Sequence, residues 1–424
     1  MRPRRRVIIC SIHYIPEVVG VGRYSGDLAE YFVARGHDVA VITAPPHYPS
    51  WKVNPPYSGR RWMKEMVGGV IAYRCPIWVH SEMRGFRRLL APASFALSAG
   101  PVAFWQILTR RPHVVLVVEP TLLIAPFAIL AAKLVRARAI LHVQDLEVDA
   151  AFAVGHLGGG GLLERCGAFF ERVMTSAFDR VITISHRMAE KLRTKGVPDA
   201  RLRVIRNWVD LDHIKPMPPS RRYRGELGLK DDDFVVLYAG TVGAKQGIRL
   251  LIDAARELQD KAGVVFVIAG EGPMRPELER AAAKMRNFRV IGFQPEARLG
   301  EFLSIADVHV LPQQRAAADL VLPSKLGGML ASGRRIIITA DPGTELADFV
   351  QHCCALTPPG DGSALARAIV TYRCEPVCET KVAERLALAQ TLSKDDIVLA
   401  FEQAALFSDV DPNGRATAEL IPSR

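Results

Sequence analysis

Four short segments of the chain combine glycine, lysine or serine at positions that suit the binding of a phosphate group. Each follows a run of β-branched residues and precedes a helical pattern. Glycines there let backbone N–H groups approach an anion, and the helix N-terminus adds a favourable dipole. The first segment, PEVVGVGRY, contains Gly20 and Gly22. Ser25 takes the third glycine position of the dinucleotide pattern G-x-G-x-x-G, which disfavours an NAD site. A plain structural turn is the alternative explanation.

The second and third segments follow strands in the C-terminal half. GTVGAKQG contains Thr241 and Lys245, and a lysine in such a loop supplies a point charge beside backbone donors, as a diphosphate requires. A surface lysine in a turn is the alternative. AGEGP contains Gly270, Glu271 and Gly272, and this signal is weak by itself because many strand-to-helix loops look alike.

The fourth segment, VLPSKL, begins a short helical pattern that ends at ASG. Pro323 fits the first turn of a helix. Ser324, Lys325 and the free N–H groups of that turn would form an anion site. A capped structural helix without a ligand is the alternative.

Strand-like and helix-like patterns alternate along all 424 residues, which predicts βαβ units and parallel sheets. Strong strand patterns are VIICSI near the start, HVVLVVE and RAILHVQD further on, and FVVLYAG and VVFVIAG in the second half. We therefore expect an α/β protein with two Rossmann-like domains, residues 1–206 and 207–392. Residues 393–410 should form a C-terminal helix that packs back towards the first domain, and 411–424 a disordered tail.

The composition favours an anionic partner. The formal net charge is +11, and no zinc-finger spacing, RNP-like segment or recognition-helix signature points to nucleic acid. The seven cysteines are odd in number and scattered, which indicates reduced thiols and a cytoplasmic protein. The group around His352 to Cys378 fits no standard zinc spacing, so we expect no metal there.

An uncharged stretch from Leu89 to Thr109 is flanked by arginines at both ends. Its length permits a membrane span, but Pro92 and Pro101 disfavour one. We expect a buried or membrane-surface helical hairpin in a protein that is peripheral at the inner face of the cytoplasmic membrane. Ordinary solvated charges explain the arginines equally well.

The four motifs in this order resemble glycosyltransferase family 4, and the likeness covers nearly the whole chain. The most specific stretches are residues 11–49, 140–150, 237–247 and 321–333. Within that family the sequence is similar to the glycosyltransferases of colanic acid and other exopolysaccharide biosynthesis. The resemblance implies the GT-B fold, in which two parallel sheets face each other across a cleft.

The resemblance also implies roles for the motif residues. The C-terminal domain would bind the nucleotide-sugar donor and the N-terminal domain the acceptor. Lys245 matches the lysine that neutralises the donor diphosphate, and Ser324 and Lys325 match the helix start that faces it. Gly20 and Gly22 match the loop that closes over the phosphates. The AGEGP loop matches the one near the nucleoside.

Three positions depart from the family pattern. Thr241 stands where many relatives carry an arginine, so a second positive charge is missing or is supplied elsewhere. Leu320 and Gly328 occupy the places of the E-x7-E glutamates, with Asp319 the nearest acid. The residues that hold the donor sugar therefore stay open.

The usual histidine–aspartate pair of the catalytic region reads Gln144-Asp145 in this sequence. Asp145 is our candidate for a polar group of the acceptor site, and His142 is a second, weaker one. A buried strand-end aspartate and a core histidine are the respective alternatives.

The resemblance implies a retaining glycosyltransferase that moves a sugar from a GDP- or UDP-sugar, GDP-fucose among them, to a lipid-diphosphate-linked saccharide. Charge stabilisation of the leaving diphosphate would come from Lys245 and Lys325. No D-x-D motif lies at a suitable position, so we expect metal independence and no cofactor. An anionic membrane surface is a further candidate partner. The alternatives are a nucleotide-sugar epimerase of the same fold and a non-catalytic scaffold that binds nucleotide sugar.

Overall fold

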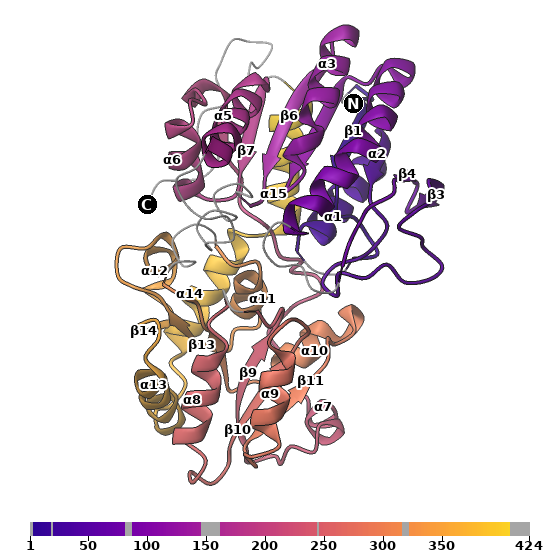
Figure 1. Ribbon diagram of the computed structural model, residues 1–424. Coiled ribbons are helices and arrows are strands. Elements are labelled where there is room, and N and C mark those ends of the chain that lie inside the picture. The colour runs from indigo at the N-terminus through magenta and orange to yellow at the C-terminus, as the bar shows by residue number, and fades with distance from the viewer. Residues whose placement is uncertain are drawn as a thin grey trace. The chain divides into compact units, whose positions relative to one another are not determined.

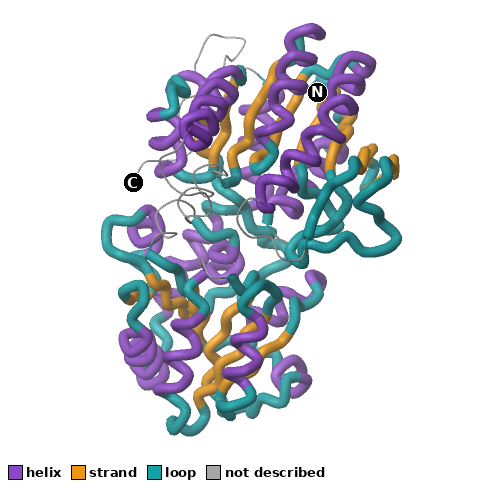
Figure 2. Tube along the Cα trace, in the orientation of Figure 1, coloured by secondary structure: helices purple, strands orange, loops and turns teal. Residues whose placement is uncertain are grey.

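The computed structural model describes residues 3–17, 20–80, 87–145, 162–243, 246–315 and 322–407. These form two units, shown in Figures 1 and 2: residues 1–205 with 397–424, and residues 206–396. The predicted boundary after residue 206 lies one residue beyond this division. The predicted tail, residues 411–424, lies outside the described residues.

The first unit is an eight-stranded sheet in the order β3-β4-β2-β1-β5-β6-β7-β8, parallel except for the β3–β4 pair. Its strands are β1 (Arg6–Ser11), β2 (Asp38–Thr43), β3 (Met63–Val67), β4 (Val70–Arg74), β5 (Val114–Glu119), β6 (Arg138–Val143), β7 (Arg180–Thr183) and β8 (Leu202–Val204). Its helices are α1 (Val21–Ala34), α2 (Arg87–Arg110), α3 (Ala125–Val135), α5 (Leu162–Ala177) and α6 (His186–Thr194), with short 3-10 turns η1 (Leu122–Ile124) and η2 (Asp199–Arg201).

The second unit is a six-stranded parallel sheet in the order β11-β10-β9-β12-β13-β14. Its strands are β9 (Phe234–Ala239), β10 (Val264–Ala269), β11 (Phe288–Ile291), β12 (Val308–Leu311), β13 (Arg335–Thr339) and β14 (Ala355–Thr357). Its helices are α7 (Arg221–Glu226), α8 (Arg249–Glu257), α9 (Arg275–Ala282), α10 (Leu299–Ser304), α11 (Lys325–Ala331), α12 (Glu345–Val350), α13 (Gly362–Cys374) and α14 (Glu379–Gln390), with the 3-10 turn η4 (Glu296–Arg298).

Both sheets are doubly wound, because the chain runs outward from a central strand, returns and then continues on the other side. The order reverses between β1 and β5 in the first unit and between β9 and β12 in the second. Ligands of such sheets bind at the carboxyl ends of the strands beside this reversal. The loops after β1 and β9 occupy that place, and they are the first and second glycine segments of the sequence.

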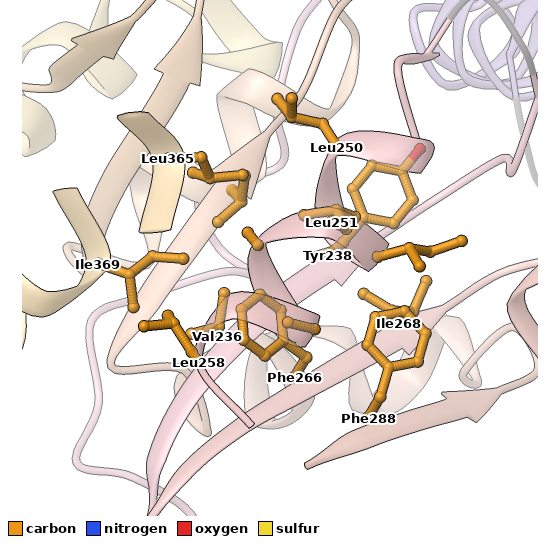
Figure 3. Close-up of a cluster of buried hydrophobic side chains, with 14 of the residues drawn as sticks. Val236, Tyr238, Leu250, Leu251, Leu258, Phe266, Ile268, Phe288, Leu365 and Ile369 are labelled. Carbon is orange, nitrogen blue, oxygen red and sulfur yellow. The ribbon is translucent and has the colours of Figure 1, made fainter. Parts of the chain in front are cut away.

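The core of the second unit fixes the strands that carry the loops. Figure 3 shows Phe266 and Ile268 of β10 packed with Leu251 of α8, while Leu365 and Ile369 of α13 close another side. All five side chains are at most 1% exposed. The β-branched runs are buried on both faces of the sheet, as expected for parallel strands covered by helices.

The uncharged stretch from Leu89 to Thr109 lies within one helix, α2, so the expectation of a hairpin inside it was wrong. The two prolines lie inside α2, and the helix packed beside it is α3. The two helices approach closely where Gly100 meets Phe127, since a Cβ on that glycine would lie 2.6 Å from the phenylalanine ring. Among the helices in the described part of the chain, none is long and apolar enough to cross a bilayer.

The last helix, α15 (Lys394–Leu406), contributes its second half to the first unit. Glu402, with a side chain only 1% exposed, contacts His37 Nε2 at 3.0 Å. Arg180 and Arg138 donate hydrogen bonds to the carbonyls of Ala404 and Phe407. The two arginine contacts satisfy carbonyl groups at the end of α15, which have no partner within the helix.

Candidate active site

Lys325 of α11 lies against the loop that follows β9. Its Nζ lies 4.2 Å from the ring centroid of Tyr238 and hydrogen-bonds the hydroxyl of that tyrosine. The tyrosine hydroxyl in turn donates to the carbonyl of Thr241, at 2.5 Å. Lys325 Nζ itself is 3.5 Å from the same carbonyl. The fourth sequence motif therefore meets the second at Lys325.

Gly240 makes this approach possible. Its φ is +142°, and a Cβ on it would lie 2.1 Å from Lys325 Cε. Only glycine tolerates both the backbone angle and the contact. Gly240, directly after β9, therefore leaves room for the lysine side chain.

The environment of Lys325 is unusual for a lysine. Among the described residues, no carboxylate lies within ion-pair distance of its Nζ. Burial lowers the pKa of Lys325 to about 7, because removal from water disfavours the charged ammonium form. A diphosphate placed beside it would supply that missing charge.

The third motif has a structural explanation. A Cβ on Gly270 would lie 1.8 Å from the carbonyl oxygen of Gly240, and one on Gly272 would lie 2.4 Å from that of Val242. The two loops pair through their backbones, as Val242 N–H donates to the Glu271 carbonyl at 2.9 Å. These glycines therefore allow the loops after β9 and β10 to pack together.

Glu271 binds a neighbouring arginine. Its Oε1 accepts from Arg275 at 2.6 Å, and Arg275 also donates to the carbonyls of Gly270 and Ile291. The side chain of Glu271 is 43% exposed, so a ligand can reach it. Its predicted place near a nucleoside stays a prediction.

The helix that begins after Pro323 and Ser324 is short. α11 has seven residues, and Ser324 makes no side-chain cap. A hollow between residues 206–208 and 322–327 has a volume of only about 20 Å³, roughly the room of one water molecule. Because α11 is short, its backbone dipole is small, and the positive charge at this helix start comes mainly from the Lys325 side chain.

Three residues that the sequence analysis singled out have no described position. Lys245 and the acid Asp319 lie outside the described residues, as does Leu320. Gly328 lies on α11, where a Cβ would meet Ile214 and Leu303 at 3.4 Å. The position of the second family glutamate is thus in apolar surroundings.

In the first unit, Gly20 and Gly22 begin α1 as the sequence indicates. Gly20 is the N-cap with φ +63°. A Cβ on Gly22 would lie 2.9 Å from Glu17 Cβ, so this glycine allows the loop after β1 to fold back onto the helix.

Asp145 and His142 differ in their surroundings. Asp145 is exposed just beyond β6. His142 is 3% exposed, and its ring packs edge-on against Phe401 of α15, with centroids 4.8 Å apart. Burial lowers the pKa of His142 to about 3, so it is neutral. These contacts favour the core role that we gave as its alternative.

A polar cluster that the sequence analysis missed lies after β1 and β2. Glu17 Oε2 accepts from His13 Nδ1 at 2.8 Å, and Glu17 Oε1 accepts from the backbone N–H groups of His47 and Tyr48 at 2.8 and 2.9 Å. The rings of His13 and His47 stack with centroids 5.0 Å apart. The only sequence signal for it was the His-x3-Glu spacing at the end of a strand.

The fold and the site together define a GT-B glycosyltransferase. Residues 19–208 match the glycosyl transferase 4-like domain, and residues 233–373 match the glycosyl transferases group 1 domain. The sucrose-phosphate synthase of Thermosynechococcus elongatus superposes with a TM-score of 0.72 at 18% identity, over 94% of this chain and 98% of that one. Anabaena HepE, solved in complex with UDP and glucose, gives a TM-score of 0.67 at 14% identity, over 94% and 99% of the two chains.

A curated relative matches over almost its whole length. WcaI of Escherichia coli (strain K12), named as a colanic acid biosynthesis glycosyl transferase, is 37% identical over 408 residues, which are 93% of this chain and 98% of that protein. WbjE of Pseudomonas aeruginosa, named as a glycosyltransferase, is 26% identical over 282 residues, 64% of this chain and 67% of that protein. The chain therefore belongs to glycosyltransferase family 4.

Proposed function

We propose that the protein transfers a sugar, with retention of configuration, from a nucleotide-diphosphate sugar to a lipid-diphosphate-linked saccharide in exopolysaccharide biosynthesis. The observation that carries this proposal is Lys325 beside the loop after β9, half-buried and without a carboxylate partner among the described residues. A site that holds an unpaired cation next to glycine backbone suits a diphosphate. The similarity to WcaI supports the exopolysaccharide assignment.

Lys325 also accounts for the missing arginine. Its ammonium group lies 3.5 Å from the carbonyl of Thr241, the residue that stands in the arginine's place. The second positive charge of the donor site is therefore supplied from α11 rather than from the loop. Together with Lys245, it would stabilise the leaving diphosphate without a metal ion.

The reaction that we propose needs no strong protein base. The bond between the sugar C1 and the diphosphate oxygen breaks, and the acceptor oxygen bonds to C1 from the same face. The acceptor hydroxyl proton passes to the leaving diphosphate oxygen. The protein supplies the charge that makes the diphosphate a good leaving group, and Asp145 is the candidate polar group for the acceptor.

A lipid-linked acceptor fits the surface of α2 and α3. The exposed residues Leu97, Pro101 and Trp105 recur at four-residue spacing on α2, so they share one side of the helix. Leu130 and Leu134 are exposed on α3, at 55% and 62%. Apolar ridges on neighbouring helices are typical of a surface that enters the headgroup region of a bilayer.

Basic residues flank these ridges. Arg111 follows α2, Lys133 and Arg136 lie at the end of α3, and all three are exposed. Arg61 and Trp62 are exposed as well, and the Trp62 indole donates to the Ser98 carbonyl of α2 at 3.3 Å. We propose that this face contacts an anionic membrane surface.

The test is a binding and transfer assay with UDP, GDP and their sugar conjugates. Calorimetry should show that one nucleotide binds, and that Lys325→Met and Lys245→Ala each weaken binding at least tenfold. Release of nucleotide should then require the acceptor lipid fraction and should persist in EDTA. Binding without turnover on any acceptor would favour a scaffold. Sugar isomerisation without an acceptor would favour an epimerase.

A further inference from the structure

Two adjacent cysteines lie in the turn between α12 and β14. Cys353 and Cys354 belong to the cysteine group in which the sequence analysis expected no metal, and both are free thiols. Their sulfur atoms are 3.7 Å apart, a distance that allows one thiol to donate a hydrogen bond to the other. The backbone N–H groups of both residues donate to the Val350 carbonyl at 3.0 Å, so neither residue is held in a strand ladder.

A metal ion needs more ligands than this pair offers. Zinc in proteins takes three or four side-chain ligands. In the part of the chain that the structure describes, no third cysteine, histidine or carboxylate lies close enough to share an ion with the two sulfurs. Oxidation to a disulfide is the chemistry that two neighbouring thiols offer by themselves.

Positive charge lies beside the pair. Arg385 Nη1 donates to the Cys353 carbonyl at 2.9 Å, and Lys381 Nζ donates to the carbonyl of the residue before it. The hydrogen bond from the Cys354 thiol lowers the pKa of Cys353, and so do Arg385 and Lys381, while burial and Glu384 oppose them. Thiolates are the reactive form of cysteine, and neighbouring cations favour them.

We propose that Cys353 and Cys354 form a modification site at which a hydroperoxide oxidises the two thiols to a reversible disulfide between neighbouring residues. Cys354 is partly exposed, whereas Cys353 is 4% exposed, so the oxidant meets the pair at Cys354. Because the two thiols share one proton after the first ionisation, the negative charge can lie on the more exposed sulfur. The site goes beyond the proposed function and does not depend on it.

The oxidation takes two balanced steps. The Cys354 thiolate attacks one oxygen of the hydroperoxide, the O–O bond breaks, and the leaving alkoxide or hydroxide takes up a proton to give an alcohol or water. The Cys353 sulfur then attacks the sulfur of the resulting sulfenic acid, and the S–O bond breaks. The proton of the Cys353 thiol leaves with the hydroxyl group as water, so two thiols are oxidised and one hydroperoxide is reduced.

The disulfide is expected to be easy to reduce again. Neighbouring Cα atoms are about 3.8 Å apart across a trans peptide, below the roughly 4.4–6.8 Å that is usual for a disulfide. A strained disulfide has a higher reduction potential and is of the labile, regulatory kind. Thiol reductants would therefore restore the two thiols.

Closure of the disulfide alters the contacts of Arg385. This side chain, 2% exposed, donates to the Cys353 carbonyl and also to the Gly333 carbonyl at 3.2 Å, so it ties α14 to the turn that follows α11. The Cys353 carbonyl belongs to the peptide group inside the closed ring, and that group turns as the two sulfurs move from 3.7 Å to about 2.05 Å. Oxidation should leave the buried guanidinium without this acceptor, which is destabilising.

The experiment oxidises the full chain with hydrogen peroxide in small molar excess, blocks the remaining thiols with N-ethylmaleimide and digests the product with trypsin. Residues 336–367 form one tryptic peptide, whose only cysteines are Cys353 and Cys354. By mass spectrometry this peptide should be two hydrogen atoms lighter than its dithiol form and carry no maleimide. It should accept two maleimide groups when dithiothreitol is added and removed before blocking.

Substitutions separate this pair from the other thiols. Cys353→Ser and Cys354→Ser should each abolish the loss of two hydrogen atoms. The double substitution Cys374→Ser with Cys378→Ser, at two exposed cysteines of the same unit, is the matched control and should retain it. Both the unsubstituted chain and this control should unfold at a temperature about 2–4 °C lower when oxidised, as loss of one hydrogen bond to a buried charged group predicts.

Three results would overturn the inference. They are a peptide that stays in its dithiol form, a peptide that gains oxygen without forming a disulfide, and a disulfide that joins either cysteine to Cys374 or Cys378. Equal unfolding temperatures of the reduced and oxidised chains would refute the release of Arg385. Because the mass of the peptide is read on the unsubstituted chain, the test does not depend on the folding of any variant or on nucleotide binding.

Discussion

Among the described residues of the proposed donor site, Lys325 is the one whose charge changes near neutral pH. Its pKa of about 7 means that the free protein loses this positive charge as the pH rises through neutrality. A bound diphosphate stabilises the ammonium form and raises its pKa, so binding above pH 7 takes up a proton.

The first prediction follows from this linkage. We expect nucleoside diphosphate affinity to fall about tenfold between pH 6 and pH 8, because the protonated fraction of a group with a pKa near 7 falls by about that factor. Calorimetry in two buffers with different ionisation enthalpies measures both the affinity and the proton uptake.

Lys325→Arg is the control for this pH dependence. Arginine stays charged at both pH values, so the variant should show only the dependence that comes from the ionisation of the nucleotide itself. Identical profiles for the variant and the unsubstituted chain would assign the effect to the phosphate and not to Lys325.

The second prediction concerns Gly270. A methyl group there would overlap the Gly240 carbonyl, with 1.8 Å between the two atoms, so we expect Gly270→Ala to lower the free energy of unfolding by about 2–3 kcal/mol. Gly225→Ala, in α7 with nothing within 4 Å of its added Cβ, should instead be neutral or stabilising by about 0.5–1 kcal/mol. Urea unfolding compares the two. If the two substitutions changed the free energy of unfolding equally, the backbone at Gly240 and Gly270 would have to move apart at little cost.

Among the elements, α15 completes the core of the first unit from the other end of the chain. Phe401 is fully buried against His142, and Glu402 is bound to His37. The β6 strand therefore reaches its final packing only when residues more than two hundred positions later are in place.

The third prediction tests that dependence. Phe401→Ala should destabilise the first unit by about 3–5 kcal/mol, since it leaves a cavity at a fully buried aromatic site. Phe169→Ala makes the same change in α5 of the same unit at a side chain that is 69% exposed, and should cost little. Thermal unfolding followed by calorimetry is the measurement. A similar small loss in both variants would show that α15 is not part of the core.

At the scale of the whole molecule, a positive net charge occurs together with exposed apolar side chains on the first unit. The net charge of +11 favours anionic surfaces at long range, while Leu97 and Trp105, 75% and 64% exposed, offer apolar area at contact. Burial of on the order of 100 Å² of that area would contribute about 2.5 kcal/mol.

The fourth prediction is therefore a two-part dependence of membrane binding. The chain should co-sediment with vesicles that contain phosphatidylglycerol and be released by high salt, because exposed charges are screened within about a nanometre at physiological ionic strength. The double substitution Leu97→Ser with Trp105→Ser should weaken binding at least tenfold. Val377→Ser, at an exposed valine of the second unit, should leave binding unchanged. Equal binding by all three proteins would rule out the α2–α3 face as the contact.

Much of the fold could be predicted from the sequence, because local patterns determine it. The β-branched runs correspond to β1, β5, β6, β9 and β10 to within about two residues, and the alternation with helical patterns predicted parallel sheets. β3 and β14 were missed: the edge strand β3 has alternating exposure, and β14 has only three residues. Membership of glycosyltransferase family 4 was also predicted from the motifs and is confirmed by the comparisons.

Contacts between distant segments could be decided only by the tertiary structure. The sequence placed Lys325 at a helix start, but its position beside Gly240 depends on how β9 and α11 pack, 85 residues apart along the chain. Likewise, the sequence marked AGEGP as a candidate ligand loop, but only the structure shows that its glycines also let the loops after β9 and β10 pack together. Glu17 and His47 carried no motif because their hydrogen bonds join loops after different strands. Local propensity and hydrophobic period determine which elements form, whereas side-chain contacts in the site arise from packing over long separations, which no local pattern records.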